Sequence, residues 1–318
     1  MFVYSDDYDL DWPRHLFPTT KYRLLYERVL AEEVARKEEV LSPVPASDDD
    51  MKLVHGLRYM DTLRAMTADP NMAIWAGFEA PITSKTLQAL YSCTGGTILA
   101  AKKAFAQKQF WLNLGGGFHH AFPDRGEGFC FINDVAVAAR ALQRDTQVGR
   151  IVVVDCDLHQ GNGTAKIFED EASVVTFSIH QENLYPPKER SNIDVGLADD
   201  VGDEEYLVKL EDGLKRAFEG QSFDLMFFLA GADPYVHDQL GSLQLTKDGL
   251  MRRDEVVLAT AASHNLPVAV TLAGGYAHRT QDVVDIHLNT ARLVATYNRR
   301  GAIGSPSSES GDRRRPHA

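Results

Sequence analysis

The sequence contains few cysteines, no long hydrophobic run and no excess of positive charge. Its three cysteines, Cys93, Cys130 and Cys156, are an odd number without a pairing pattern, so we expect reduced thiols and a cytoplasmic location. No stretch reaches the roughly 18 uncharged apolar residues that a membrane span requires. The first residues also lack the basic and apolar regions of a signal peptide. A membrane protein and a disulfide-stabilised secreted protein are therefore both disfavoured.

The charge balance of the chain is acidic, with 33 basic and 45 acidic side chains and a formal net charge of −12. Such a surface repels phosphate backbones, so nucleic acid is not expected as a partner. Basic protein tails and cationic small molecules would instead be attracted. An acidic balance also serves solubility alone, so charge by itself identifies no partner.

Short apolar runs rich in β-branched and aromatic residues alternate along the chain with segments of helical spacing. The predicted strands are Phe2–Ser5, Phe110–Leu114, Ile151–Val154, Val174–Ser178, Leu225–Ala230 and Val268–Leu272. The predicted helices are Lys21–Val40, Thr86–Phe105, Asn133–Arg144, Glu204–Phe218, Lys247–Ser263 and Val283–Tyr297. This alternation predicts an α/β protein in which helices cover both faces of a mostly parallel sheet.

Two segments of the chain are polar enough to lie outside the core. Residues 301–318 consist almost wholly of glycine, serine, proline and charged residues, which predicts a disordered tail after a single domain over residues 1–300. Ser42–Asp50 is predicted to be a surface loop. We interpret its acidic triplet, Asp48 to Asp50, as a solvated turn rather than a metal site.

Potential metal ligands follow two of the predicted strands. Asp157 and His159 come soon after Ile151–Val154, and an extended chain points both of their side chains to one side. Asp233 follows Leu225–Ala230 after a Gly-Ala pair that lets the backbone approach closely. An isolated aspartate at such a place would usually cap a helix or a turn. Because ligands bind where parallel strands end, we predict that the three residues together form a catalytic zinc or iron site with an open position.

A pair of histidines follows a third predicted strand. Three glycines after Phe110–Leu114 lead directly into Phe118, His119 and His120. Adjacent histidines are often surface residues, but this pair lies at the same sheet edge as the predicted metal ligands. Acid–base roles are therefore a reasonable interpretation.

Two aromatic residues near these motifs have both a structural and a functional interpretation. Tyr276 follows the pair Gly274-Gly275 at the end of Val268–Leu272, where its hydroxyl would be able to donate to a developing oxyanion. Packing alone would explain a tyrosine there equally well. Phe129, after Gly128, is either a core residue or the wall of a narrow channel, and its loop position favours the wall.

In chain order, these motifs resemble those of the zinc-dependent histone deacetylases. The matching segments are Gly115 to His120, Gly128 to Cys130, Asp155 to Gly163, Gly231 to Pro234 and Gly274 to Tyr276, with Arg14 to Pro18 similar to bacterial members. The form His159-Gln160-Gly161-Asn162-Gly163 is most similar to the class IV branch and its bacterial relatives. The resemblance implies the arginase/deacetylase fold, in which three α/β/α layers contain a central eight-stranded parallel sheet.

The resemblance also implies catalytic roles for individual residues. The metal ligands that it implies, for Zn²⁺ or alternatively Fe²⁺, are Asp157, His159 and Asp233. His120 would be the general base for the attacking water, and His119 would stay charged or protonate the leaving amine. Tyr276 would polarise the amide carbonyl.

Substrate and potassium sites follow from the same resemblance. The Gly128 carbonyl would accept the substrate amide N–H, Phe129 would flank the acyl-lysine tunnel, and Tyr185 is a candidate wall residue. The structural K⁺ site that the resemblance implies consists of Asp155, Asp157, His159 and Ser178.

Asn162 departs from the better-known pattern, in which an aspartate supports each histidine. A carboxylate favours a protonated imidazole, whereas an amide orients the ring without adding charge. We therefore hypothesise that His119, paired with Asp155, is the more basic histidine. His120, paired with Asn162, would then stay neutral and able to accept a proton.

The predicted reaction is metal-dependent removal of acetyl or longer fatty acyl groups from lysine side chains. Small acylated amines such as acetylpolyamines are an alternative substrate. The motifs contain the residues for hydrolysis, whereas the residues at the rim of the site, which select the substrate, lie outside the motifs. A dinuclear arginase-like enzyme would need bridging carboxylates, which Gln160-Gly161 does not supply. A non-catalytic module that binds acyl-lysine would need neither Tyr276 nor the two histidines.

Overall fold

The computed structural model describes residues 1–13, 15–69, 71–75 and 78–301. The first residue of the Arg14 to Pro18 motif and the predicted tail beyond residue 301 lie outside the described residues. Within the described ranges, no helix has both the length and the apolar character needed to span a membrane.

The centre of the molecule is an eight-stranded sheet in the order β2-β1-β3-β8-β7-β4-β5-β6, and every neighbouring pair is parallel. The strands are β1 (Phe2–Val3), β2 (Val40–Leu41), β3 (Phe110–Asn113), β4 (Ile151–Asp155), β5 (Val174–Gln181), β6 (Ile193–Leu197), β7 (Leu225–Leu229) and β8 (Val268–Thr271). The predicted parallel sheet is confirmed, and β2 and β6 are edge strands that the sequence analysis did not predict.

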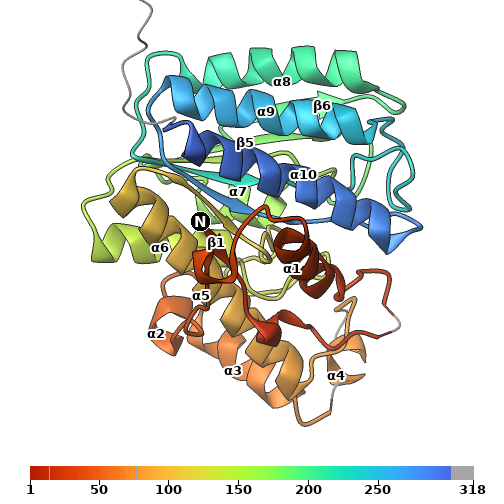
Figure 1. Cartoon of the computed structure of the whole chain (residues 1–318). Coiled ribbons are helices and arrows are strands. Elements are labelled where there is room, and N and C mark those ends of the chain that lie inside the picture. The colour runs from red at the N-terminus through yellow and green to blue at the C-terminus, as the bar shows by residue number, and fades with distance from the viewer. Residues whose placement is uncertain (14, 70, 76–77, 302–318) are drawn as a thin grey trace, which may run out of the picture.

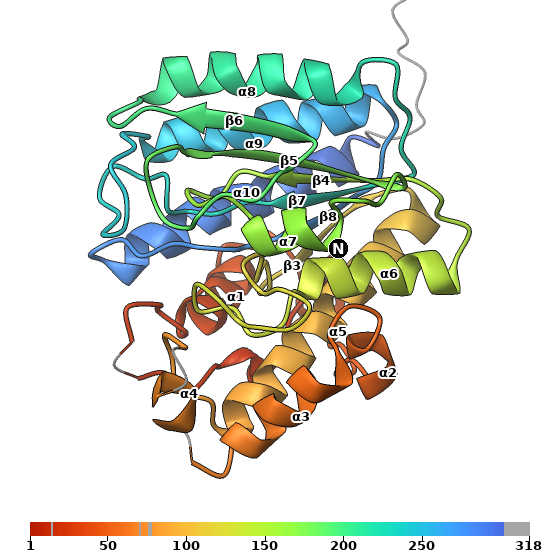
Figure 2. The same cartoon turned by 180° about the vertical axis from the view of Figure 1, so that it is seen from behind.

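Helices cover both faces of this sheet (Figures 1 and 2). On one face α8, α9, α10 and α1 pack in succession, and on the other α5 and α6 pack together with the short α7. The helices are α1 (Lys21–Ala31), α2 (Asp48–Met51), α3 (Leu57–Met66), α4 (Asn71–Trp75), α5 (Ser84–Gln107), α6 (Asp134–Asp145), α7 (Asn162–Ile167), α8 (Asp203–Phe218), α9 (Lys247–Ser263) and α10 (Thr280–Arg299), with 3₁₀ turns at Asp6–Tyr8 and Lys37–Glu39.

The inner strands are apolar along their whole length because both of their faces are covered. Every residue of β3, β4, β7 and β8 is buried. Continuous Val, Leu and Phe runs of this kind are typical of parallel strands between two helical layers. The polar residues of these strands, Asn113, Asp155 and Thr271, are therefore confined to the strand ends.

Two predicted segments differ from the structure. The helix predicted over Lys21–Val40 ends at Ala31, and Glu33 just beyond it adopts a left-handed φ of 54° that a helix cannot continue through. In the predicted loop Ser42–Asp50, the acidic triplet forms the first turn of the short helix α2, and Asp48 and Asp49 are exposed to solvent as predicted. The reason is the Ser47 side chain, which accepts the Asp50 N–H and caps a helix start that favours negative charge.

Parallel strands bring their carboxyl ends to one edge of the sheet. In the register of β4, Asp155 lies beside Ser178 of β5 on one side and Leu229 of β7 on the other. The loops after β3, β4, β7 and β8 consequently meet at this edge, which is where ligands bind in such folds.

Candidate active site and metal centre

Asp157, His159 and Asp233 form a buried cluster at the ends of β4 and β7. One ligand atom from each lies within 4.8 Å of the others. The Nδ1 atom of His159 is 3.3 Å from Asp157 Oδ1 and 3.3 Å from Asp233 Oδ2. The structure thus brings together the three residues that the sequence analysis predicted as ligands.

The chemistry of this cluster fits a bound divalent cation. Asp233 Oδ2 is buried and forms no hydrogen bond of regular geometry with the described residues, although His159 Nδ1 lies 3.3 Å away. Its negative charge is costly there unless a cation balances it. Burial lowers the pKa of His159, but the carboxylates of Asp157 and Asp233 outweigh burial and raise this pKa to about 10. Carboxylates that hold a proton so strongly would also attract a metal. An Asp–His–Asp set suits zinc or ferrous iron.

Glycines leave the space that this cluster needs. A Cβ atom on Gly274 would lie 2.1 Å from Asp233 Oδ2, and one on Gly231 would lie 2.6 Å from Asp157 Oδ2. The Gly274 N–H also donates to Asp157 Oδ2 at 2.7 Å. The loop after β8 can approach the carboxylates this closely only because it carries no side chain there.

The two histidines that follow β3 have different partners. His119 Nδ1 lies 2.7 Å from Asp155 Oδ2, and His120 Nδ1 lies 2.8 Å from Asn162 Oδ1. Burial lowers the pKa of His119, but the negative charges of Asp155 and then Asp157 outweigh it and raise this pKa to about 9. Burial, followed by the charges of His119 and His159, holds the pKa of His120 well below its usual value. This is the order that the Asn162 hypothesis requires.

Asp134, at the start of α6, shapes the loop that presents these histidines. Its carboxylate accepts the N–H groups of Gly117 and Phe118 at 2.8–3.0 Å, and Gly116 and Gly117 have φ values of 72° and 90°. Such backbone angles suit glycine. Asp134 carries no signal of this role in the sequence, because an acidic residue in the first turn of a helix is common without any further role.

His55 forms hydrogen bonds with the later part of the loop between β3 and α6. Its Nδ1 donates to the Phe122 carbonyl at 3.0 Å, and its Nε2 accepts the Asn133 N–H at 3.0 Å. This pattern requires a neutral ring, because a protonated imidazole has no acceptor. Burial accordingly lowers the pKa of His55 to about 4.

We therefore expect His55 to make the protein sensitive to acid. Its pKa in the folded state lies below the unfolded value of 6.5, so its contribution is complete above pH 6.5 and is lost as the pH falls towards 4. A difference of this size is worth about 3 kcal/mol at most. Urea unfolding at a series of pH values should show a shallower loss of stability in His55→Gln. The exposed His264→Gln serves as the control, and identical slopes in wild type and His55→Gln would contradict this prediction.

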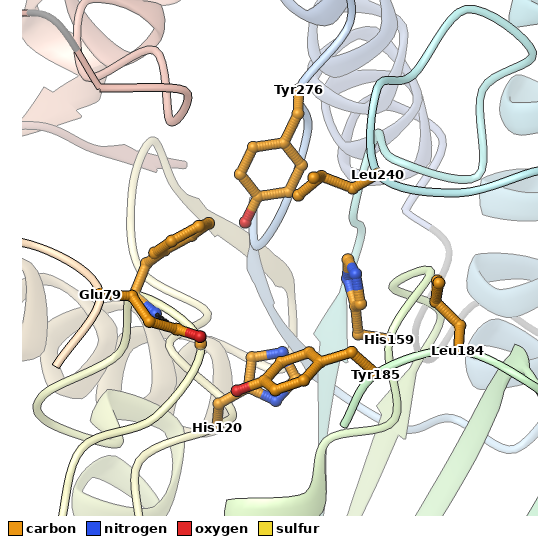
Figure 3. A pocket seen from close by; sticks show the side chains of 9 residues that line it. Glu79, His120, His159, Leu184, Tyr185, Leu240 and Tyr276 are labelled. Carbon is orange, nitrogen blue, oxygen red and sulfur yellow. Dashed lines mark hydrogen bonds between the residues drawn. The ribbon is translucent and has the colours of Figure 1, made fainter. Parts of the chain in front are cut away.

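A cavity of about 210 Å³ reaches His159, one of the three predicted metal ligands (Figure 3). It is lined by Glu79, His120, Gly128, Phe129, His159, Leu184, Tyr185, Leu240 and Tyr276. The three residues predicted to contact substrate, Gly128, Phe129 and Tyr185, all belong to this lining. The lining residues Glu79, Leu184 and Leu240 carried no sequence signal, because they lie in loops without a motif.

Tyr276 reaches this cavity from the loop after β8. The residue is 6% exposed, and its hydroxyl points into the space bordered by His120 and His159 (Figure 3). Lys21 on α1 is fully buried beneath the same loop and donates from Nζ to the carbonyls of Ala273 at 2.7 Å and Gly274 at 3.3 Å. Lys21 was not predicted as a site residue.

The residues predicted for a potassium site also lie together. Asp155 and Ser178 are register partners on β4 and β5, and Asp155 Oδ1 accepts the Asp157 N–H at 3.1 Å. The Ser178 hydroxyl lies 2.9 Å from His180 Nδ1. Binding of K⁺ at this place stays a prediction.

Comparisons with known proteins agree with this geometry. A family model described as the histone deacetylase domain matches residues 15–291. An uncharacterized protein of Picosynechococcus sp. is 39% identical over 287 residues, covering 90% of this chain and 95% of that protein. Histone deacetylase 2 of Arabidopsis thaliana is 29% identical over 315 residues, covering 95% of this chain and 79% of that protein.

More distant similarity extends to an animal protein and to a solved structure. Human histone deacetylase 1 is 27% identical over 286 residues, covering 83% of this chain and 58% of that protein. The crystal structure of the HDA15 HD domain matches with a TM-score of 0.79 at 20% identity, covering 92% of this chain and 90% of that chain. At this identity the structural match establishes a shared fold.

Proposed function

The chain belongs to the histone deacetylase family, and from this premise we propose that it is a metal-dependent hydrolase that removes the acyl group from acylated lysine side chains. Its eight-stranded parallel sheet between helical layers is the arginase/deacetylase fold. The observation that carries the proposal is the convergence of a metal-binding triad, two differently paired histidines and a tyrosine hydroxyl on one cavity.

In this proposal Asp157, His159 and Asp233 hold the metal, Zn²⁺ or alternatively Fe²⁺. When bound, such a metal polarises the acyl carbonyl and makes a water molecule more acidic. The burial of both carboxylates supports this assignment, and so does Asp233 Oδ2, which forms no regular hydrogen bond with the described residues. The predicted K⁺ would occupy the neighbouring strand ends at Asp155 and Ser178.

The chain's own groups would carry the proton transfers. His120 donates from Nδ1 to Asn162, so its Nε2 is free to accept a proton from the attacking water. His119, held protonated by Asp155, can deliver a proton to the leaving amine. The Tyr276 hydroxyl donates to the oxyanion as it forms, and the Gly128 carbonyl accepts the substrate amide N–H.

The lining of the cavity supports an acylated lysine side chain as its occupant. Phe129, Leu184, Tyr185, Leu240 and Tyr276 give the cavity apolar and aromatic walls, which suit an acyl group and the methylenes of lysine. Acetyl-lysine and longer fatty acyl-lysine are therefore both candidate substrates.

A second candidate substrate is a small acylated amine that carries another positive charge, such as an acetylpolyamine. Glu79 lines the cavity, is exposed to solvent and accepts the Phe129 N–H at 3.2 Å. Its carboxylate, together with the net charge of −12, favours a cation at the mouth of the cavity.

One experiment tests both candidates. Purified protein is assayed for bound metal and then for turnover of an acetyl-lysine peptide, a myristoyl-lysine peptide and an N-acetylpolyamine. We expect an acyl-lysine peptide to be hydrolysed with the highest kcat/KM, and the ratio of the values for the two peptides measures the preferred acyl length. Preference for the acetylpolyamine would favour the second candidate, and the absence of turnover for all three by metal-loaded protein would refute the proposal.

We further propose that the chain belongs to a class IV-like branch of the family, because Asn162 takes the place of a second aspartate.

The substitution Asn162→Asp tests the role of Asn162 in keeping His120 neutral. A carboxylate beside His120 raises the pKa of that base by about 1 unit or more. The acidic limb of the kcat/KM profile should therefore move to higher pH by a similar amount. Asn289→Asp, on the outer part of α10, adds the same charge elsewhere, and an unmoved limb in Asn162→Asp would contradict the assignment.

A further inference from the structure

Two consecutive side chains, Asp238 and Gln239, grip the backbone of Tyr276. The Tyr276 N–H donates to Asp238 Oδ2 at 2.7 Å, and the Tyr276 carbonyl accepts from Gln239 Nε2 at 2.7 Å. Both polar backbone groups of this residue are thus held by side chains from one segment. A backbone fixed at both groups leaves the tyrosine ring little freedom to change its direction.

The gripping segment is also part of the cavity wall. The second oxygen of Asp238 accepts the Leu240 N–H at 2.9 Å, and Leu240 lines the cavity near Tyr276 (Figure 3). An isolated antiparallel bridge pairs Asp238 with Ala277. Residues 238–240 therefore fix the position of Tyr276 relative to the cavity wall that Leu240 forms.

The loop before Tyr276 needs such support, because its backbone is held in uncommon conformations. Ala273 has a φ of 50° and Gly275 a φ of 140°. Lys21 holds the carbonyls of Ala273 and Gly274, which leaves the last part of the loop to other contacts. Lys21 thus holds residues 273 and 274 of the loop, and Asp238 and Gln239 hold residue 276.

We propose that Gln239, together with Asp238, is a positioning residue that fixes the Tyr276 backbone and so directs the Tyr276 hydroxyl into the cavity. The inference rests on the proposed function, since it takes that hydroxyl to be the oxyanion donor. Gln239 is exposed, whereas Asp238 is buried, so Gln239 can be replaced without disturbing the core. Its contact needs only an N–H donor at the end of a side chain of similar reach.

The first test compares side chains with and without that donor. Gln239→Met keeps the length and loses the donor, and it should lower kcat about tenfold with KM unchanged. This value lies between the small effect of one hydrogen bond and the roughly 10²-fold effect of a 1 Å displacement. Gln239→Arg restores a donor and should recover most of the loss. Gln244→Met is the matched control, because Gln244 Nε2 donates to the Ser242 carbonyl at 2.9 Å instead.

The second test asks whether the effect passes through Tyr276. In a Tyr276→Phe background there is no hydroxyl to position, so adding Gln239→Met should cause no further loss of kcat. Equal losses in both backgrounds, or full kcat in Gln239→Met alone, would overturn the inference.

A third measurement does not depend on activity. Amide hydrogen exchange in a peptide covering residues 272–278 should be several-fold faster in Gln239→Met than in wild type or Gln244→Met. Faster exchange in a protein that hydrolyses no acyl-lysine would support the positioning role while refuting the proposed function. Unchanged exchange in Gln239→Met would overturn the positioning role whatever the activity.

Discussion

Replacing Tyr276 with phenylalanine should lower kcat for an acetyl-lysine peptide by about 10²–10³-fold, the usual effect of losing one oxyanion donor. Among the described residues, no group forms a hydrogen bond with the Tyr276 hydroxyl, so its removal leaves no protein group unsatisfied. The ring contacts with Phe17, Phe129 and His159, at centroid distances of 5.8, 6.0 and 6.4 Å, are available to phenylalanine as well. Folding should therefore be unaffected while catalysis is lost.

Steady-state kinetics and thermal unfolding together check this expectation. KM should change little, because the hydroxyl acts mainly as charge develops in the transition state. Tyr26→Phe removes a hydroxyl from a tyrosine that stacks on Tyr4 with a centroid distance of 4.2 Å, and it should keep wild-type kcat. If Tyr276→Phe kept nearly full kcat, the tyrosine would be a packing residue, which is the structural interpretation of its position after the glycine pair.

The positions of the site residues were largely predictable, because the ends of buried parallel strands can be recognised from the sequence. Runs such as Ile151–Val154 and Leu225–Ala230 identify buried strands, and parallel pairing then brings the polar residues after them to one edge. This reasoning predicts that Asp157, His159 and Asp233 lie close together, and the structure places them in one cluster. Helix α9, over Lys247–Ser263, was likewise predicted with its observed bounds.

The supporting residues were not predictable, because their partners lie far away in the chain. A lysine at the start of a helix is ordinarily solvated, and Lys21 is buried only because it meets the Ala273 carbonyl 252 residues later. Gln239 forms a hydrogen bond with Tyr276, which lies 37 residues later in the chain. No local sequence pattern identifies Lys21 or Gln239 as a supporting residue. Edge strand β6 escaped prediction for another reason: only Val195 and Leu197 of its five residues are buried, so it lacks a continuous apolar run.

Removing the metal should abolish hydrolysis and lower the stability of the protein. A ligand that binds only the folded state stabilises it by about 2.7 kcal/mol when present at 100 times its Kd. Treatment with a chelator should therefore lower the Tm, and stoichiometric Zn²⁺ or Fe²⁺ should restore both the Tm and activity. The metal that restores activity at the lower concentration would identify the better cofactor in vitro. Activity that survives complete removal of metal would contradict the proposed mechanism.

Asp233→Asn separates the two roles of this carboxylate. Burial, followed by the nearby charge of Asp157, raises the pKa of Asp233 to about 6, so this carboxylate is unfavourable in the absence of a cation. Without metal the variant should thus be at least as stable as wild type, whereas its Tm should no longer rise when metal is added. Asp212→Asn, at an exposed position on α8, should keep the metal response of wild type. An undiminished metal-dependent rise in Tm in Asp233→Asn would show that Asp233 is not a ligand.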